Sequence, residues 1–277
     1  MIHSFLSLLK HDIFEGVLRK WKYFLVAALF FAFVDFVFVH NVSSLFSSDS
    51  PDLKCSITDI ILNMFIGNEP FDPAVRKGIS LSVTWFVFHA LLFSFIGFYI
   101  TDDLKKDATS FILRVKSKRQ WWTSKFLWCI ITVFAYYALF FVIAIIFAIF
   151  WGTASFDASS LIAEEIFEIQ VLDVSVCNII FSSLLLPMTI SVSIAVFEAA
   201  LSLILKPVYS FLIVICYLAA SAFYCSVCLL FNFSMVTRNN FYGVNGVLNQ
   251  YGALIAIIIT IAGYLIGMTL IKNKDIV

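Results

Sequence analysis

Charged residues are scarce in this 277-residue chain: 13% are Asp, Glu, Lys or Arg, whereas 62% are hydrophobic. A soluble protein of this size has about 25% charged and 45–50% apolar residues, so this composition cannot build a water-facing surface. Its 18 basic residues are balanced by 18 acidic ones, which leaves no basic excess to neutralise phosphates. The composition therefore excludes a soluble enzyme, a nucleic-acid-binding domain and a disordered tail.

Catalytic motifs are also missing. None of the ten glycines is followed by lysine, so the chain has no Gly-Lys-Ser/Thr loop to hold nucleotide phosphates. The four histidines form no H-E-x-x-H pair for a metal, and no G-x-S-x-G elbow presents a nucleophilic serine. We therefore expect that this chain is not an enzyme, and that it binds no metal or other cofactor itself.

The six cysteines lie mostly in or beside apolar runs, a pattern that does not predict a disulfide framework. The pair Cys225-x-x-Cys228 has the spacing of a metal or redox site. Because it lies inside a long apolar run and has no second pair, we interpret it as two buried thiols on one face of a helix.

Long hydrophobic runs dominate the chain. About 20 apolar residues suffice to cross a bilayer core of roughly 30 Å as a helix. Six segments meet this requirement, at about 23–40, 80–100, 126–151, 178–205, 208–231 and 251–271. Lys206-Pro207 predicts a tight hairpin between the fourth and fifth spans, and Pro187 predicts a bend within the fourth. The sequence thus predicts an all-α polytopic membrane protein with one transmembrane domain over residues 1–277.

Basic residues are distributed unevenly between the two sides of this arrangement. Fourteen of the 18 lie on the side that holds the N-terminus, and four lie on the other: Lys54, Arg76, Lys77 and Arg238. The positive-inside rule places both termini in the cytoplasm. Acidic residues are concentrated in the two outer loops, 41–79 and 152–177, where a solvated face is a simpler explanation than binding of a cationic substrate.

Residues 2–19 predict an amphipathic helix that lies in the membrane interface. Most of its apolar side chains fall within one arc of a helical wheel, whereas Leu8, Phe14 and Leu18 break the pattern. The residues in the arc are Ile2, Phe5, Leu6, Leu9, Ile13 and Val17. The basic and aromatic residues of Arg19-Lys20-Trp21-Lys22 follow it, as is typical of a helix that rests on the inner leaflet.

Three ionisable residues fall within the predicted spans: Asp35, His89 and Glu198. Such groups are costly in hydrocarbon and usually face the protein interior, a partner or water. Asp35 and Glu198 are candidates for lining a translocation path or a proton relay, although a satisfied buried polar contact is the simpler role for all three. In the last span, Gly263-x-x-x-Gly267 permits close approach of another helix, for packing or for contact between subunits.

The cytoplasmic loop at 101–125 is the most informative segment. It contains an acidic pair, an apolar patch, a Ser-Lys-Arg turn and a Trp-Trp pair before the third span. A loop that only sets topology needs lysine and arginine but no particular order. This order is typical of a short amphipathic helix that docks onto a cytoplasmic partner.

In these features the chain resembles the permease subunits of ABC-2 type ABC transporters, which have six spans, an N-terminal interfacial helix and a patterned loop between spans two and three. Asp102 and Asp103 stand at the acidic position of that loop, and Ala108-Thr109 stands where Gly-Thr is usual. Residues 114–118 cover the Leu-to-Ser-Arg portion, and Ser124-Lys125 replaces the usual Gly-Lys. Alanine in place of glycine, and the lack of proline before Ser117, depart from the family pattern.

The resemblance implies that this loop is a coupling helix that touches a separate cytoplasmic ATPase pair, which binds ATP and magnesium. The residues it assigns to coupling are Asp103, Thr109, Phe111, Ile112, Arg114, Val115, Ser117, Lys118 and Arg119. It further implies a second permease, identical or homologous, a bacterial cell membrane, and export of a hydrophobic or amphipathic substrate such as a peptide or antimicrobial. The alternative is an ion-coupled secondary transporter that uses Asp35 and Glu198.

Overall fold

A computed structural model describes residues 2–46, 53–69, 81–106, 117–169, 174–242 and 246–273. Within these ranges, the side chains of 2–4, 101–106 and 273 are left out of the description. The described residues form helices and no β-strand, which confirms the predicted all-α class.

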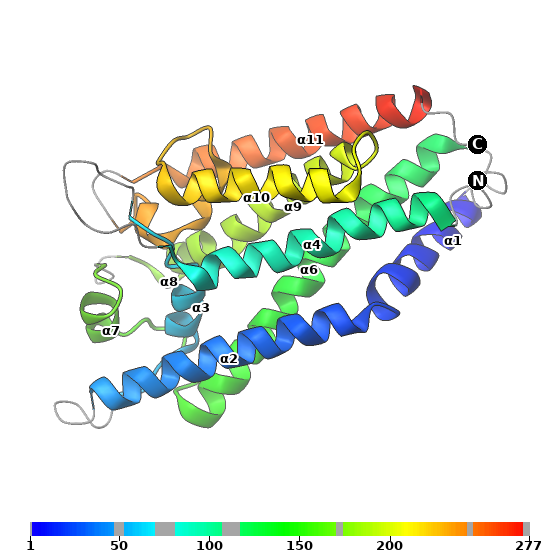
Figure 1. Ribbon diagram of the computed structural model, residues 1–277. Helices are drawn as coiled ribbons and strands as arrows, with labels where there is room; N and C mark the ends of the chain where they lie inside the picture. Colours follow the sequence, from blue (N-terminus) through cyan, green and yellow to red (C-terminus); the bar gives the residue numbers. More distant parts are fainter. Residues whose placement is uncertain are drawn as a thin grey trace.

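Five helical segments are long and apolar enough to cross a membrane. They are α2 (Trp21–Leu45), α4 (Val83–Lys106), α6 (Lys118–Trp151), the run from α8 (Val176–Ile180) through α9 (Leu186–Leu201), and α11 (Asn249–Asn273). These helices extend along the length of one bundle (Figure 1). The lengths and compositions of the five helices are those of a multi-pass membrane protein, as the hydrophobic runs predicted.

The predicted span 208–231 is shorter than expected. Helix α10 (Pro207–Phe223) has 17 residues, and the chain then forms two short 3-10 turns, η3 (Leu230–Ser234) and η4 (Val236–Arg238). Cys225 and Cys228 consequently lie in an exposed loop after α10, so their assignment to buried positions on a helix is wrong.

A buried arginine ends α10 at this position. The Arg238 guanidinium donates to the carbonyls of Ser221, Ala222 and Tyr224 in the last turn of the helix. It also donates from Nε to the carbonyl of Asn68, at 2.8 Å. Burial lowers the pKa of Arg238 to about 10, which leaves it charged at neutral pH. A charge beyond the end of the apolar run therefore decides where this helix stops.

The predicted hairpin is present, and a π-helical turn lies where the sequence predicts a bend. Helix α10 starts at Pro207, directly after Lys206. A π-helical turn, η2 (Phe181–Leu185), precedes Pro187, and the hydroxyls of Ser182 and Ser183 both donate to the carbonyl of Ile179, at 3.0 and 2.6 Å. Pro187 has no backbone N–H to donate, and the helical hydrogen-bond pattern changes to a π-helical turn just before it.

A short helix, α3 (Ile57–Phe65), lies inside the segment that the sequence assigned to a solvated outer loop. Ser56 and Asp59 form a capping box at its start. The Asp59 carboxylate also accepts the backbone N–H of Ser159, at 3.0 Å, and therefore ties the segment after α2 to the segment after α6. Asp59 is buried and burial raises its pKa, so its expected role on a solvated face is wrong.

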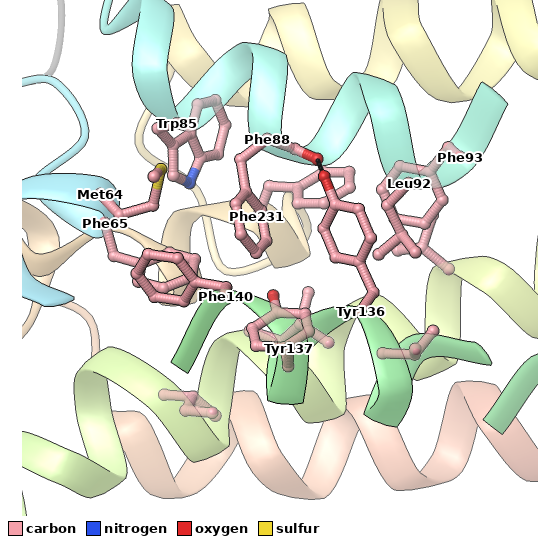
Figure 2. Close-up of a cluster of buried hydrophobic side chains, with 14 of the residues drawn as sticks. Met64, Phe65, Trp85, Phe88, Leu92, Phe93, Tyr136, Tyr137, Phe140 and Phe231 are labelled. Carbon is pink, nitrogen blue, oxygen red and sulfur yellow. Dashed lines mark hydrogen bonds between the residues drawn. The ribbon is translucent and has the colours of Figure 1, made fainter. Parts of the chain in front are cut away.

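Helix α3 inserts Phe65 into an aromatic core between α4 and α6 (Figure 2). The Phe65 ring lies 5.0 Å from that of Phe88 and 5.9 Å from that of Tyr137. Tyr136 donates its hydroxyl to the carbonyl of Phe88, at 2.8 Å. Rings at these separations pack favourably and join the outer loop to the spans.

The N-terminal segment forms a separate helix, α1 (Ile2–Ile13), followed by a π-helical turn, η1 (Phe14–Leu18). It lies at the end of the bundle where α6 begins and α11 ends (Figure 1). The buried stripe of this segment consists of Leu8, Asp12 and Gly16. Leu6 and Phe14, in contrast, are more than half exposed. The helix is present as predicted, but it packs on the bundle through a face that contains a carboxylate.

Candidate functional site

Five residues that the resemblance assigned to coupling lie outside the described residues: Thr109, Phe111, Ile112, Arg114 and Val115. Asp103 belongs to the last turns of α4, and only its backbone is described.

The other three coupling candidates form the start of α6. Ser117 is its N-cap and accepts the backbone N–H of Gln120, at 3.4 Å. Lys118 donates to the carbonyl of Lys272 near the end of α11, at 3.5 Å, and Arg119 is exposed.

A buried ion pair lies two turns further along α6. Lys125 Nζ is 2.5 Å from Asp12 Oδ1, and both side chains are almost fully buried. The Ser124 hydroxyl donates to Asp12 Oδ2, also at 2.5 Å, and the Tyr99 hydroxyl donates to Oδ1 at 3.3 Å. Residues from α1, α4 and α6 therefore meet at one carboxylate, and we call Asp12, Tyr99, Ser124 and Lys125 the Asp12 cluster.

The charges of the Asp12 cluster compensate each other. Burial alone would raise the pKa of Asp12. The Lys125 ammonium and the hydrogen bonds from His11, Lys125 and Ser124 outweigh this effect, so the pKa lies below its ordinary value. Lys125 Nζ also lies 4.9 Å from the centroid of the Tyr99 ring, within range of a cation–π interaction. The Asp12 carboxyl is thus ionised at neutral pH.

Gly16 lets α1 approach the bundle closely enough to form this cluster. A Cβ at this position would overlap the indole Nε1 of Trp128 and would lie 2.7 Å from Cζ of Tyr99. The rings of Tyr99 and Trp128 are themselves only 4.1 Å apart, so neither can move aside easily. The sequence pattern missed this site because an acidic residue lies within the buried stripe of α1.

Glu198 is buried at the junction of α9, α4 and α6. A Cβ on Gly97 of α4 would lie 2.6 Å from Glu198 Oε1, so the carboxyl packs against the α4 backbone. Neither carboxyl oxygen has a hydrogen-bond partner among the described residues. The simpler interpretation of Glu198, a buried carboxyl whose oxygens are hydrogen-bonded, is therefore wrong among the described residues.

Asp35 and His89 are also buried. Neither carboxyl oxygen of Asp35 has a partner within the described ranges. His89 Nδ1 lies 2.9 Å from the carbonyl of Trp85, and its ring is 5.2 Å from those of both Trp85 and Phe231. No interaction among the described residues joins Asp35 to Glu198, so the structure does not bring these two path candidates together.

The two glycines of the last span pack within the chain. A Cβ on Gly263 would lie 3.0 Å from Val196 of α9, and one on Gly267 would overlap the Trp122 ring of α6. Trp122 Nε1 donates to the carbonyl of Tyr264, at 2.9 Å. Both glycines therefore lie against α9 and α6 of the same chain.

No group of three or more metal-ligating side chains occurs in the portion of the chain that is described. Comparisons with protein-family models, with curated proteins and with solved structures find no match to this chain.

Proposed function

We propose that this chain is the membrane-spanning permease subunit of an ABC-2 type exporter, with α10 as a short sixth span and both termini in the cytoplasm. The observation that carries the proposal is the Asp12 cluster. It fastens the N-terminal helix to α6 close behind the loop whose residue order resembles a coupling helix. A force applied to that loop would pass directly into α6, and through the buried ion pair into α1.

In this proposal the chain binds no nucleotide. A separate cytoplasmic ATPase pair binds ATP and magnesium, and a second permease, identical or homologous, completes the translocation path. The substrate class is hydrophobic or amphipathic, such as a peptide or an antimicrobial. The apolar interior and the scarcity of charge in the spans favour such a molecule over a strongly charged one.

Ile112→Asp or Val115→Asp should release the ATPase from this chain while leaving membrane insertion intact. A carboxylate on an apolar docking face would be buried without a partner, which is unfavourable. The measurement is recovery of the ATPase with affinity-tagged chain from detergent-solubilised membranes. Leu161→Asp, at an exposed apolar position in α7 (Ser160–Glu165) at the opposite end of the bundle, is the matched control and should retain the ATPase. Retention by both loop variants would show that the ATPase docks elsewhere.

A specific observation supports a second candidate, the ion-coupled transporter. Glu198 and Asp35 are buried carboxyl groups without hydrogen-bond partners among the described residues. Ionisable groups within a membrane span commonly serve in proton or ion pathways. In this reading, binding and release of a proton at Glu198 would drive transport by one polypeptide.

Glu198→Gln separates the two candidates. Glutamine has nearly the same shape but cannot release a proton, so an ion-coupled transporter would lose pH-gradient-driven flux while keeping its fold. A permease driven by ATP should keep its ATP-dependent flux. The measurement is substrate uptake into proteoliposomes, with an imposed pH gradient or with ATP and the co-purified ATPase. Asp35→Asn is the companion variant, and ATP-independent flux that disappears in Glu198→Gln would favour the second candidate.

A further inference from the structure

The loop after α10 presents two thiols to the surface. Cys225 and Cys228 are both free and exposed. A turn closed by the hydrogen bond from Leu229 N to the carbonyl of Ser226, at 3.0 Å, contains Cys228 and directly follows Cys225. The two cysteines therefore occupy an irregular loop rather than a helix, with two residues between them.

The backbone of this loop is held from the inside. Asn232 Nδ2 donates to the carbonyls of Tyr224 and Ser226, at 3.0 and 2.9 Å. The Tyr217 hydroxyl donates to the carbonyl of Cys228, at 2.7 Å. Because these carbonyls are tied to buried groups while residues 225–228 are all exposed, the loop keeps both thiols at the surface.

The loop lies at the end of the bundle away from the start of α1 and the end of α11 (Figure 1). Most basic residues belong to the α1 end, so the positive-inside rule places the loop on the outer side. Thiols in extracytoplasmic compartments meet disulfides and oxidising conditions, whereas cytoplasmic thiols are kept reduced.

We propose that Cys225 and Cys228 form a redox-active dithiol that undergoes exchange with small-molecule disulfides. One thiol loses its proton, and its thiolate attacks a sulfur of the small disulfide. The disulfide bond breaks, a mixed disulfide forms and the first small thiolate leaves. The second cysteine thiolate then attacks the protein sulfur of the mixed disulfide and expels the second small thiolate. The dithiol is oxidised by two electrons, the small disulfide is reduced to two thiols, and these take up the two protons.

The exchange site adjoins the anchor of the outer loops. The guanidinium of Arg238 donates to the carbonyl of Tyr224, the residue before Cys225, and it also holds the end of α10 and the backbone at Asn68. An internal disulfide would close a ring beside this anchor and restrict the segment that joins α10 to η3. The site does not depend on the proposed permease function, because the thiol chemistry requires neither ATP nor a substrate.

The test uses the full chain, purified in mild detergent under reducing conditions and then exposed to oxidised glutathione. Remaining thiols are labelled with a maleimide and mapped by mass spectrometry. We expect Cys225 and Cys228 to disappear together from the labelled set, in a peptide lighter by two hydrogen atoms. Cys177 and Cys216 are exposed but have no neighbour at this spacing, so they serve as internal controls and should not form that species.

Variants with one of the two cysteines replaced test the two-step exchange, because each leaves a single thiol that can form only the mixed disulfide. Cys225→Ser and Cys228→Ser should each stop at the mixed disulfide, visible as a glutathione adduct on the remaining cysteine. Cys177→Ser should behave as the wild type. The proposal is overturned if 225 and 228 both stay maleimide-reactive in the wild type, or if each carries its own glutathione adduct without internal closure.

Discussion

Lys125→Met should destabilise the folded chain by about 3–5 kcal/mol, because it leaves a buried carboxylate without its partner cation. The Asp12 carboxylate would lose the ammonium 2.5 Å away, while Ser124 and Tyr99 would remain as its donors. The measurement is unfolding of the detergent-solubilised chain by heat or denaturant. Arg119→Met is the matched control: Arg119 lies on the same helix and is exposed, so the change should cost less than about 0.5 kcal/mol.

A double variant and a pH series test the cause of this loss. Replacing both charges, as in Asp12→Leu with Lys125→Met, should recover most of the stability, because neither charge is then buried alone.

Asp12 has a lowered pKa in the folded chain. Its contribution to the free energy of unfolding is therefore present above its unfolded-state pKa and disappears as the pH falls through the folded-state pKa. The difference between wild type and Lys125→Met should therefore narrow in acid. Equal stability of wild type and Lys125→Met at neutral pH would contradict the assignment.

Arg238→Met should have a comparably large effect, centred on the end of α10 and the segment around Asn68. The guanidinium donates to backbone carbonyls of Asn68, Ser221, Ala222 and Tyr224 and to the Asn232 side chain. A buried acceptor left without a donor costs about 1–3 kcal/mol, so losing several of these contacts should cost at least 3 kcal/mol. The loop between α10 and α11 should also become sensitive to limited proteolysis.

Arg238→Lys is the control for charge. Lysine keeps the positive charge but lacks the planar fork that reaches carbonyls on two sides, so it should restore only part of the stability. If Arg238→Met unfolds like the wild type and its outer loop resists protease, the carbonyls must find other donors. The role assigned to Arg238 in ending α10 would then be wrong.

The parts of the fold that follow from local hydrophobicity could be predicted from the sequence. Five of the six predicted spans correspond to long apolar helices, and Lys206-Pro207 marks the hairpin between α9 and α10. The end of α10 could not be predicted in this way, since the apolar run continues to Phe231. What stops the helix is the guanidinium of Arg238, brought back by the two short turns that follow.

The candidate site depends on contacts between distant segments. Asp12 and Lys125 are 113 residues apart, with η1, α2, α3 and α4 between them. Wheel analysis of α1 selects apolar residues rather than a stripe that contains a carboxylate. Helix α3 did carry a local signal. Ser56 is followed three residues later by Asp59 and by a short apolar run, which is a capping-box pattern that could have revealed this helix within the outer loop.

The central claim, that this chain is a permease driven by a separate ATPase, is tested most directly by what co-purifies with it. The chain would be tagged in its native host, extracted in mild detergent and isolated, and the bound proteins identified by mass spectrometry. We expect a stoichiometric soluble partner that carries a Gly-Lys-Ser/Thr phosphate-binding loop. A chain that purifies alone and still supports ATP-independent flux in liposomes would contradict the claim and make Glu198 and Asp35 the centre of the mechanism.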